Sequence, residues 1–256
     1  MDLGLEKRRA LVTGASRGLG RAITLALAAE GADVVAVARN SERLGQLAAE
    51  SAGSGTITAR RCDLADASAI EALSDVLARV DVLVINTGGP PPGPAAETSD
   101  AVWSRQFEAM FLSAVRITRL ALPGMRQRGF GRIIAVVSSG VIQPIPNLGV
   151  SNALRSALVG WAKTLAGEVA SQGITVNCLA PGRIATDRVA ELDQGRAKHE
   201  GIGVEEVERQ SRMAIPAGRY GDAAEFASVA TFLASTRASY ATGGIIRVDG
   251  GMIRSS

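Results

Sequence analysis

The stretch "TGASRGLG", residues 13–20, decides the fold, because its glycines stand between an apolar run typical of a strand and a helical pattern. Gly14 permits a tight turn, Gly18 lets the backbone approach a diphosphate, and Gly20 lets the helix pack closely on the strand. The helix N-terminus then offers free N–H groups and the positive end of its dipole to the phosphates. A lone glycine motif is weak, but this strand–turn–helix context favours nucleotide binding over a simple glycine-rich turn.

Apolar runs alternate with helical patterns along the rest of the chain. The predicted strands are 9–14, 33–39, 56–63, 81–88, 131–139, 174–182 and 244–251. The predicted helices are 21–31, 41–51, 67–80, 103–125 and 151–170. This alternation, with strands that are apolar throughout, implies a parallel sheet covered on both faces. We therefore predict an α/β fold, a doubly wound parallel sheet in a single domain over 1–256, with the charged segment 183–217 as an insertion on the substrate side.

The composition excludes several classes of protein. Of the 256 residues, 46% are hydrophobic and 21% are charged, and the net charge is only +3, so no block of basic residues indicates a nucleic-acid partner. No run of about 18 apolar residues predicts a membrane span. The N-terminal "MDLGLEKRR" precedes no apolar stretch of signal length. Cys62 and Cys178 have no metal-ligand spacing, so we expect no metal site and a cytoplasmic, reducing environment.

Further motifs carry a resemblance to a known family. They are "CDLAD" (62–66), "VINTGG" (84–89), "GRIIAVVSS" (131–139), "APGRIATDR" (180–188) and "VDGG" (248–251). With these and the glycine stretch, the chain resembles the short-chain dehydrogenase/reductase family over nearly its whole length. Its spacing is most similar to the 3-oxoacyl-[acyl-carrier-protein] reductase-like members. The resemblance implies a seven-stranded Rossmann fold, a homotetramer, and nicotinamide-dependent interconversion of a carbonyl and an alcohol in a small-molecule substrate.

The sequence favours NADP(H) over NAD(H) as the cofactor. An acidic residue about 20 positions after the last glycine would hold the ribose hydroxyls of NAD, but Ala38 and Arg39 stand there. In the family Arg17 points to the same pocket, and two guanidiniums suit a 2′-phosphate, unless both are solvated surface arginines. The resemblance also places Asp63 at the adenine amine. The cofactor-binding residues that it implies are Gly14, Ser16, Arg17, Gly18, Leu19, Gly20, Arg39, Asp63, Leu64, Asn86, Gly88, Arg155, Pro181, Gly182, Ile184 and Thr186.

The catalytic residues of the family are an Asn, a Ser, a Tyr and a Lys, and three of the four positions are changed here. Ser138 is present, thirteen residues before the tyrosine position. The tyrosine position is Ser151, the lysine position is Arg155, and the asparagine position, seven residues after Trp103, is Met110. Arg155 keeps a positive charge but is not expected to exchange its proton, because the pKa of arginine exceeds about 12. The candidate catalytic residues are Ser138, Ser151 and Arg155.

Two functions stay open at this point. One is an NADP-dependent oxidoreductase, acting on a 3-oxoacyl-thioester-like or other carbonyl compound, whose proton comes from the substrate or from a water held by the candidate catalytic residues. The other is an NADP-binding pseudoenzyme, a sensor or partner subunit, because three of the four catalytic positions are changed. No other side chain replaces them, since Tyr220 and Tyr240 lie where the family has structural residues and His199 is expected to be a solvated residue of the charged insertion. Loss of a general acid costs about 10²–10⁴ in rate, which does not by itself exclude turnover. The loop 88–98 and the insertion 183–217 should frame the substrate pocket, and their Pro and Arg content suits an acidic or acyl substrate.

Overall fold

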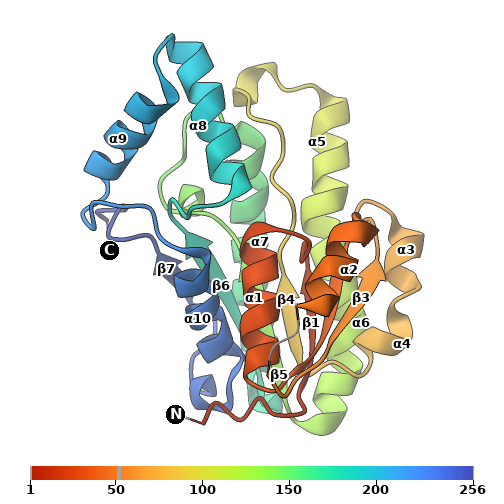
Figure 1. Cartoon of the computed structure of the whole chain (residues 1–256). Coiled ribbons are helices and arrows are strands. Elements are labelled where there is room, and N and C mark those ends of the chain that lie inside the picture. The colour runs from red at the N-terminus through yellow and green to blue at the C-terminus, as the bar shows by residue number, and fades with distance from the viewer. Residues whose placement is uncertain (1, 51–52, 256) are drawn as a thin grey trace.

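The computed structural model describes residues 2–50 and 53–255 and contains a seven-stranded sheet in which each strand is parallel to its neighbours (Figure 1). The strand order is β3-β2-β1-β4-β5-β6-β7. The strands are β1 (Arg9–Thr13), β2 (Asp33–Ala38), β3 (Ile57–Arg61), β4 (Val82–Ile85), β5 (Gly131–Val136), β6 (Ile174–Pro181) and β7 (Ile245–Val248). The doubly wound parallel sheet predicted from the sequence is confirmed. Each strand is shorter than its predicted range, because the predicted ranges extend into the flanking loops.

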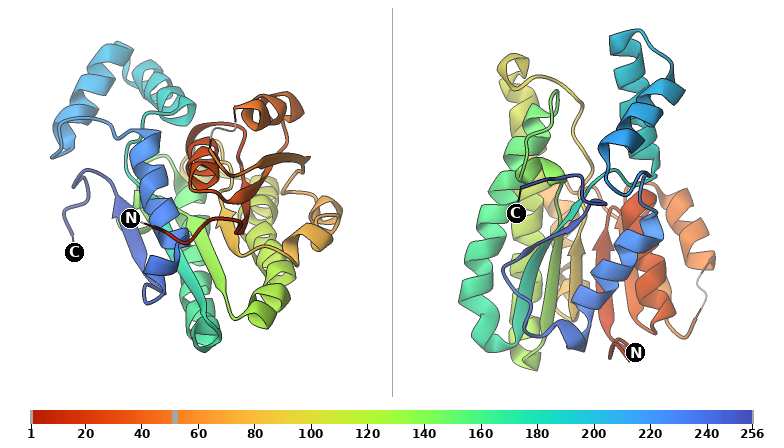
Figure 2. Two further views of the ribbon diagram at one scale, coloured as in Figure 1. Left: turned by 60° about the horizontal axis from the view of Figure 1, so that its bottom comes forward. Right: turned by 90° about the vertical axis from the view of Figure 1, so that its left-hand side faces the viewer.

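Helices cover both faces of the sheet (Figure 2). One face carries α1 (Gly18–Ala29), α2 (Ser41–Ala49) and α10 (Ala223–Ala234). The other face carries α3 (Ala67–Glu71), α4 (Ser74–Leu77), α6 (Ser113–Arg128) and α7 (Gly149–Val169). The remaining helices are α5 (Asp100–Phe107), α8 (Asp187–Glu200) and α9 (Val204–Ala214), with short 3₁₀ turns at Ala95–Glu97, Ser139–Val141, Ala170–Gln172 and Thr236–Ala238.

The core is divided into two layers by the sheet. In β1, Ala10 and Val12 belong to the cluster under α1 and α10, whereas Leu11 belongs to the cluster under α6 and α7. All three side chains are fully buried. Because successive residues of a strand point to opposite faces, a sheet covered on both sides needs apolar residues at every position, which explains why the strands do not alternate with polar residues.

The order of the strands reverses between β1 and β4. The chain moves from β1 outward to β2 and β3, then returns across the sheet to β4 and continues the other way. In sheets of this kind, ligands bind outside the carboxyl ends of the strands at the point of reversal. The stretch 13–20 leaves β1 at this point, and α8 and α9 rise above the same end of the sheet (Figure 1).

Two predicted helices differ from the structure. The helix predicted over 103–125 is α5 and α6 joined by one π-helical turn, Glu108–Leu112, which inserts a wider turn beside the predicted site. The helix predicted over 67–80 is broken into α3 and α4 between Ala72 and Leu73. Ile70, Leu73 and Leu77, on both sides of the break, are all buried in the core. Ser51, the last residue of the helix predicted over 41–51, lies outside the described residues.

The segment 183–217 contains two regular helices, α8 and α9, where the sequence indicated only loose helical character. Thr186 begins α8, and its side chain accepts a hydrogen bond from the Val189 N–H. Gly201, with a left-handed φ of 68°, ends α8. None of the helices within the described ranges is long and apolar enough to cross a membrane.

Candidate active site

The glycine loop after β1 is shaped by close contacts with the end of β4. Gly14 has a φ of +60°, and a Cβ added to it would lie 2.4 Å from the Asn86 carbonyl oxygen. A Cβ on Gly20 would lie 2.3 Å from the Gly14 carbonyl oxygen. The Asn86 N–H donates to Thr13 Oγ1 at 2.8 Å, and Asn86 Nδ2 donates to the Gly14 carbonyl at 3.3 Å. Asn86 therefore holds the loop against β4, in addition to the adenosine role that the resemblance implies.

The N-terminus of α1 has the features of a phosphate site. Its N-cap residue, Arg17, makes no side-chain capping hydrogen bond, and the first turn contains no acidic residue. The first N–H groups of a helix have no partner within the helix, so they are available to an anion. Gly18 has a φ of +55°, and the nearest atom to an added Cβ is in the Thr186 side chain at 3.6 Å. This uncapped turn fits the diphosphate of a dinucleotide.

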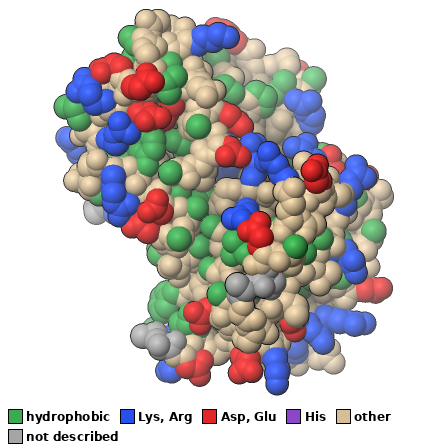
Figure 3. All heavy atoms as spheres, in the orientation of Figure 1, with side chains coloured by type: hydrophobic (Ala, Val, Ile, Leu, Met, Phe, Trp, Pro, Cys, Tyr) green, Lys and Arg blue, Asp and Glu red, His purple; other side chains and the backbone are tan. Residues whose placement is uncertain are grey.

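The predicted 2′-phosphate arginines are found on the same side, but Arg17 is already paired with α8. Arg17 Nη1 lies 2.9 Å from Glu191 Oε1 and 3.6 Å from Asp187 Oδ2. The hydrogen bond from Arg17 lowers the pKa of Glu191. Arg43 of α2, a residue that the sequence analysis missed, reaches Asp187 at 3.8 Å. Arg39 is exposed at the end of β2. Figure 3 shows Lys and Arg side chains gathered with acidic ones below α8, near the starts of α1 and α2.

The other predicted cofactor residues follow the carboxyl edge of the sheet. Asp63, with Leu64 beside it, follows β3 and accepts a hydrogen bond from the Ala65 N–H at 3.1 Å. An added Cβ on Gly88, just beyond β4, would meet nothing within 4 Å. Pro181 ends β6. Gly182 packs against Asp249, because a Cβ added to Gly182 would lie only 2.6 Å from the Asp249 Cα. Ser16, Leu19 and Ile184 complete the set, and Ile184 pairs with Gly221 in an isolated bridge.

Arg155 occupies the lysine position on α7 and is buried, with 8% of its surface exposed. Its Nη1 donates to the Val136 carbonyl at 2.7 Å, and its Nη2 lies 3.4 Å from the Thr87 carbonyl. The guanidinium therefore lies over the carboxyl ends of β4 and β5. Burial, with a smaller contribution from the charge of Arg188, lowers the pKa of Arg155 to about 10.

The two candidate serines lie close to the same strand ends. Ser138 follows β5, and its Oγ accepts a hydrogen bond from the Gly140 N–H at 3.0 Å. Ser151 is one helical turn before Arg155 on α7 and is also 8% exposed. Asn152, next to it, holds the loop before α7 by two hydrogen bonds with the backbone of Ile145. Ser138, Ser151 and Arg155 are thus placed on two elements that meet at one edge of the sheet.

Met110, at the asparagine position, lies in the π-helical turn between α5 and α6. It is buried, with 3% exposed, in a small apolar cluster with Val150 and Leu154 of α7, against which Val102 and Trp103 pack. Met110 itself offers no polar group that could support a proton-relay water.

Arg188 is a second cation at this site that the sequence analysis did not assign, although it ends the quoted motif "APGRIATDR". It lies in the first turn of α8, and its Nη2 donates to the Pro90 carbonyl at 2.8 Å. A Cβ added to Gly89 would lie 3.1 Å from the Arg188 Nε, so the Arg188 guanidinium packs on the backbone of the loop after β4. The loop 88–98 and the segment 183–217, which were predicted to frame the substrate pocket, are in direct contact through this hydrogen bond.

The side chains that were considered as replacements for the missing tyrosine do not enter this site. The Tyr220 hydroxyl donates to Asp193 at 2.7 Å, Tyr240 is fully exposed, and His199 is exposed on α8. Among the described residues, no group of three His, Cys, Asp or Glu side chains could hold a metal ion.

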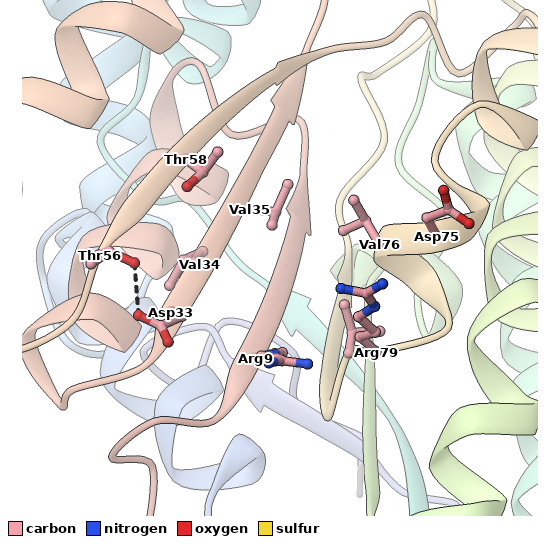
Figure 4. Close-up of a pocket in the computed structure, with 10 residues that line it drawn as sticks. Arg9, Asp33, Val34, Val35, Thr56, Thr58, Asp75, Val76 and Arg79 are labelled. Atoms are coloured by element: carbon pink, nitrogen blue, oxygen red, sulfur yellow. Dashed lines mark hydrogen bonds between the residues drawn. The ribbon is translucent and has the colours of Figure 1, made fainter.

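A hollow of about 320 Å³ lies at the opposite end of the sheet, at the starts of β1, β2 and β3 and against α4 (Figure 4). Its lining includes Arg9 and Arg79 together with Asp33 and Asp75, and Asp33 accepts a hydrogen bond from Thr56 at 2.7 Å. This charge-balanced hollow is at the amino ends of the strands, away from the glycine loop and from Arg155.

Comparison with known proteins agrees with the fold. Residues 14–253 match the family profile described as Enoyl-(Acyl carrier protein) reductase. The chain is 37% identical to the 3-oxoacyl-[acyl-carrier-protein] reductase FabG of Escherichia coli (strain K12), covering 98% of this chain and 99% of that protein. It is 34% identical to Dehydrogenase/reductase SDR family member 4 of Sus scrofa, covering 96% of this chain and 88% of that protein.

Two solved structures are similar over nearly the whole chain. The L-sorbose reductase from Gluconobacter frateurii, complexed with NADPH and L-sorbose, matches with a TM-score of 0.93 and 32% identity, covering 100% of both chains. YwfH, an NADPH dependent reductase involved in bacilysin biosynthesis, matches with a TM-score of 0.89 and 32% identity, covering 98% of this chain and 100% of that one. Together with the parallel sheet and the glycine loop, these similarities show that the chain belongs to the short-chain dehydrogenase/reductase family of oxidoreductases.

Proposed function

We propose that this protein is an NADP(H)-dependent oxidoreductase that interconverts a carbonyl compound and the corresponding alcohol. The observation that carries the proposal is that the uncapped first turn of α1 and the candidate residues Ser138 and Arg155 stand at one edge of one sheet. The cofactor is NADP(H), as the arginines near the glycine loop predicted, and the similar structures are named as NADPH dependent or as complexes with NADPH.

The chain's own residues fit this cofactor. The free N–H groups at the start of α1 would hold the diphosphate. Arg17, Arg39 and Arg43 would surround the 2′-phosphate, which takes charge-assisted hydrogen bonds from guanidiniums. Arg17 would have to exchange Glu191 for the phosphate, since it is paired with that carboxylate at 2.9 Å.

Bound NADPH supplies a hydride for the carbonyl carbon of the substrate. The protein must then orient the carbonyl and stabilise the negative charge that develops on its oxygen. Ser138 accepts its hydrogen bond from Gly140, so its own O–H is available to a substrate oxygen. Arg155 uses two of its five N–H donors on backbone carbonyls, which leaves others for the substrate or for the nicotinamide ribose.

The proton for the new alcohol must reach the oxygen without a phenol. We propose that a water beside Ser151 delivers it, because replacing a tyrosine by a serine leaves room for one. The lowered pKa of Arg155, about 10, is close to the pKa of a phenol, about 10. This pKa is below the ordinary arginine value that the sequence led us to expect, but it leaves Arg155 a cation at neutral pH, which can stabilise negative charge on the substrate oxygen.

The proposal is tested by incubating the protein with NADPH and a panel of ketones, 3-oxoacyl thioesters and oxo acids. The thioesters are included because the curated relatives are named 3-oxoacyl-[acyl-carrier-protein] reductases. Consumption of NADPH matched by formation of one alcohol supports the proposal. NADPH binding with no turnover of any compound would favour an NADP-binding pseudoenzyme instead.

A further inference from the structure

Arg155 is a buried cation without a carboxylate partner among the described residues. Its two hydrogen bonds go to the carbonyl groups of Val136 and Thr87, and it takes part in no ion pair. Only 8% of its surface is exposed, so water replaces little of the solvation that the charge has lost. A buried charge without a counter-ion is costly, and an anion that reaches it gains correspondingly.

Arg188 adds a second positive charge at the same short segment of chain. Arg155 contacts the carbonyl of Thr87, and Arg188 contacts that of Pro90 at 2.8 Å. Thr87 and Pro90 are three residues apart, so their Cα atoms are at most about 11 Å apart. In agreement with this placement, the charge of Arg188 makes the smaller contribution, after burial, to the lowered pKa of Arg155. The arrangement brings two cations to the loop after β4.

The acidic residue that pairs with Arg188 does not neutralise the two cations. Glu191 lies 3.7 Å from Arg188, but the same carboxylate makes a shorter contact of 2.9 Å with Arg17. The Glu191 side chain is also about half exposed, at 47%, so solvent screens its charge. The phosphates of the cofactor are accounted for by the start of α1 and by Arg17, Arg39 and Arg43. The cation pair Arg155–Arg188 therefore has no anion assigned to it.

We infer that the substrate carries a carboxylate, which is held by the pair Arg155–Arg188 while the neighbouring carbonyl is reduced. The inference rests on the proposed function and narrows it to oxo acids. A planar guanidinium matches a carboxylate with two parallel hydrogen bonds, whereas the acyl thioesters of the named relatives have a neutral group at this point. The reaction balances as NADPH plus one proton plus the oxo acid giving NADP⁺ and the hydroxy acid. The hydride forms the new C–H bond, and the C=O π electrons take the proton.

The test compares acids with matched neutral compounds, using acetoacetate against acetoacetamide and pyruvate against pyruvamide. Each compound is titrated by calorimetry into the protein with NADPH bound and into the protein alone. We expect each acid to bind the NADPH complex at least about 10-fold more tightly than its amide. Equal binding of acid and amide would overturn the inference.

Substitutions identify the side chains that recognise the carboxylate of the substrate. Arg188→Gln should reduce the preference for acid over amide about 10-fold, and Arg188→Lys should restore most of it. Arg209→Gln, a matched control, removes the same charge from α9, where Arg209 pairs with Glu206, and should leave the preference unchanged. A preference that persists in Arg188→Gln, or that falls equally in Arg209→Gln, contradicts the role of the pair.

Failure of the carboxylate inference can be distinguished from failure of the proposed oxidoreductase function. NADPH binding is measured in the same samples, and a protein that prefers acids without binding NADPH supports the anion site while contradicting the oxidoreductase proposal. A 3-oxoacyl thioester with a higher kcat/KM than every free oxo acid would overturn the inference and leave the proposed function standing.

Discussion

Met110 and Ser151 stand at positions where the resemblance to the family predicts an Asn and a Tyr. Met110 packs on Val150 and Leu154, which makes an apolar contact between the π-helical turn and α7. Ser151, next to Val150 on α7, is buried and makes no side-chain hydrogen bond among the described residues. Arg155 is the one ionisable group of the three, and its proton is made more acidic by burial.

The first prediction concerns these three residues as a unit. The triple variant Ser151→Tyr, Arg155→Lys, Met110→Asn should reduce a neutral ketone about 10²-fold faster than the parent, because it restores a general acid and the groups that support it. Single changes should each give much less, since catalytic residues that act together are not additive. The measurement is the rate of NADPH oxidation by the parent, single and triple variants. A parent as fast as the triple variant would show that the proton has a different source.

The second prediction concerns Arg39. Arg39→Asp should weaken NADPH binding by about 1.5–3 kcal/mol, the value of a charge-assisted hydrogen bond, and leave NADH binding nearly unchanged or improved. Fluorescence titration of both cofactors measures it. Arg61→Asp is the control, because it makes the same change of charge at an exposed arginine of the neighbouring strand β3. The Arg61 side chain donates to the Arg39 carbonyl. An equal loss for both cofactors would contradict a contact with the 2′-phosphate.

At the scale of elements, the sequence predicted the parts that depend on local pattern. The strand–turn–helix unit at 13–20 and every strand were found, because apolar runs and glycine positions specify them without distant contacts. The π-helical turn at Glu108–Leu112 and the break between α3 and α4 were missed, because both depend on how the helices meet the core. The ion pairs of α8 with Arg17 and Arg43 were missed for the same reason, since their partners Glu191 and Asp187 are far from these arginines in sequence.

The third prediction follows from α8. Glu191→Gln should tighten NADPH binding about 2- to 5-fold, because Arg17 no longer has to leave a carboxylate when it meets the 2′-phosphate. NADH binding should not change, since it has no phosphate there. The measurement is a pair of titrations on parent and variant, with Glu208→Gln on α9 as the control, where the carboxylate pairs with Arg212. Weaker NADPH binding in Glu191→Gln would show that this carboxylate supports the cofactor.

At the scale of the whole molecule, the fold places two functions at one edge. In our proposal, the starts of α1 and α2 present arginines to the nucleotide, and α7 and α8 present Arg155 and Arg188 to the substrate. The sequence located the first through the glycine stretch, but Arg188 became visible only when the fold brought α8 over the loop after β4. The same separation explains why the cofactor was predictable and the substrate was not.

The fourth prediction is that the protein forms a homotetramer. Phe107 of α5 is 40% exposed. Its ring stacks on that of Phe111 in the π-helical turn, with the ring centroids 5.2 Å apart. Exposed aromatic pairs on long helices are favourable contacts for a second copy of the chain. Sedimentation velocity at micromolar concentration should give four copies, and Phe107→Asp should shift the distribution to smaller species. A parent protein that sediments only as a monomer would contradict the prediction.

The central claim, that this tyrosine-free site still transfers hydride, is tested most directly by following the hydride itself. The protein is incubated with NADPH deuterated at C4 of the nicotinamide and with the carbonyl panel, and the products are analysed by mass spectrometry. We expect an alcohol carrying one deuterium on the former carbonyl carbon, with oxo acids as the best substrates. Protein that binds NADPH but yields no deuterated alcohol from any compound would contradict it.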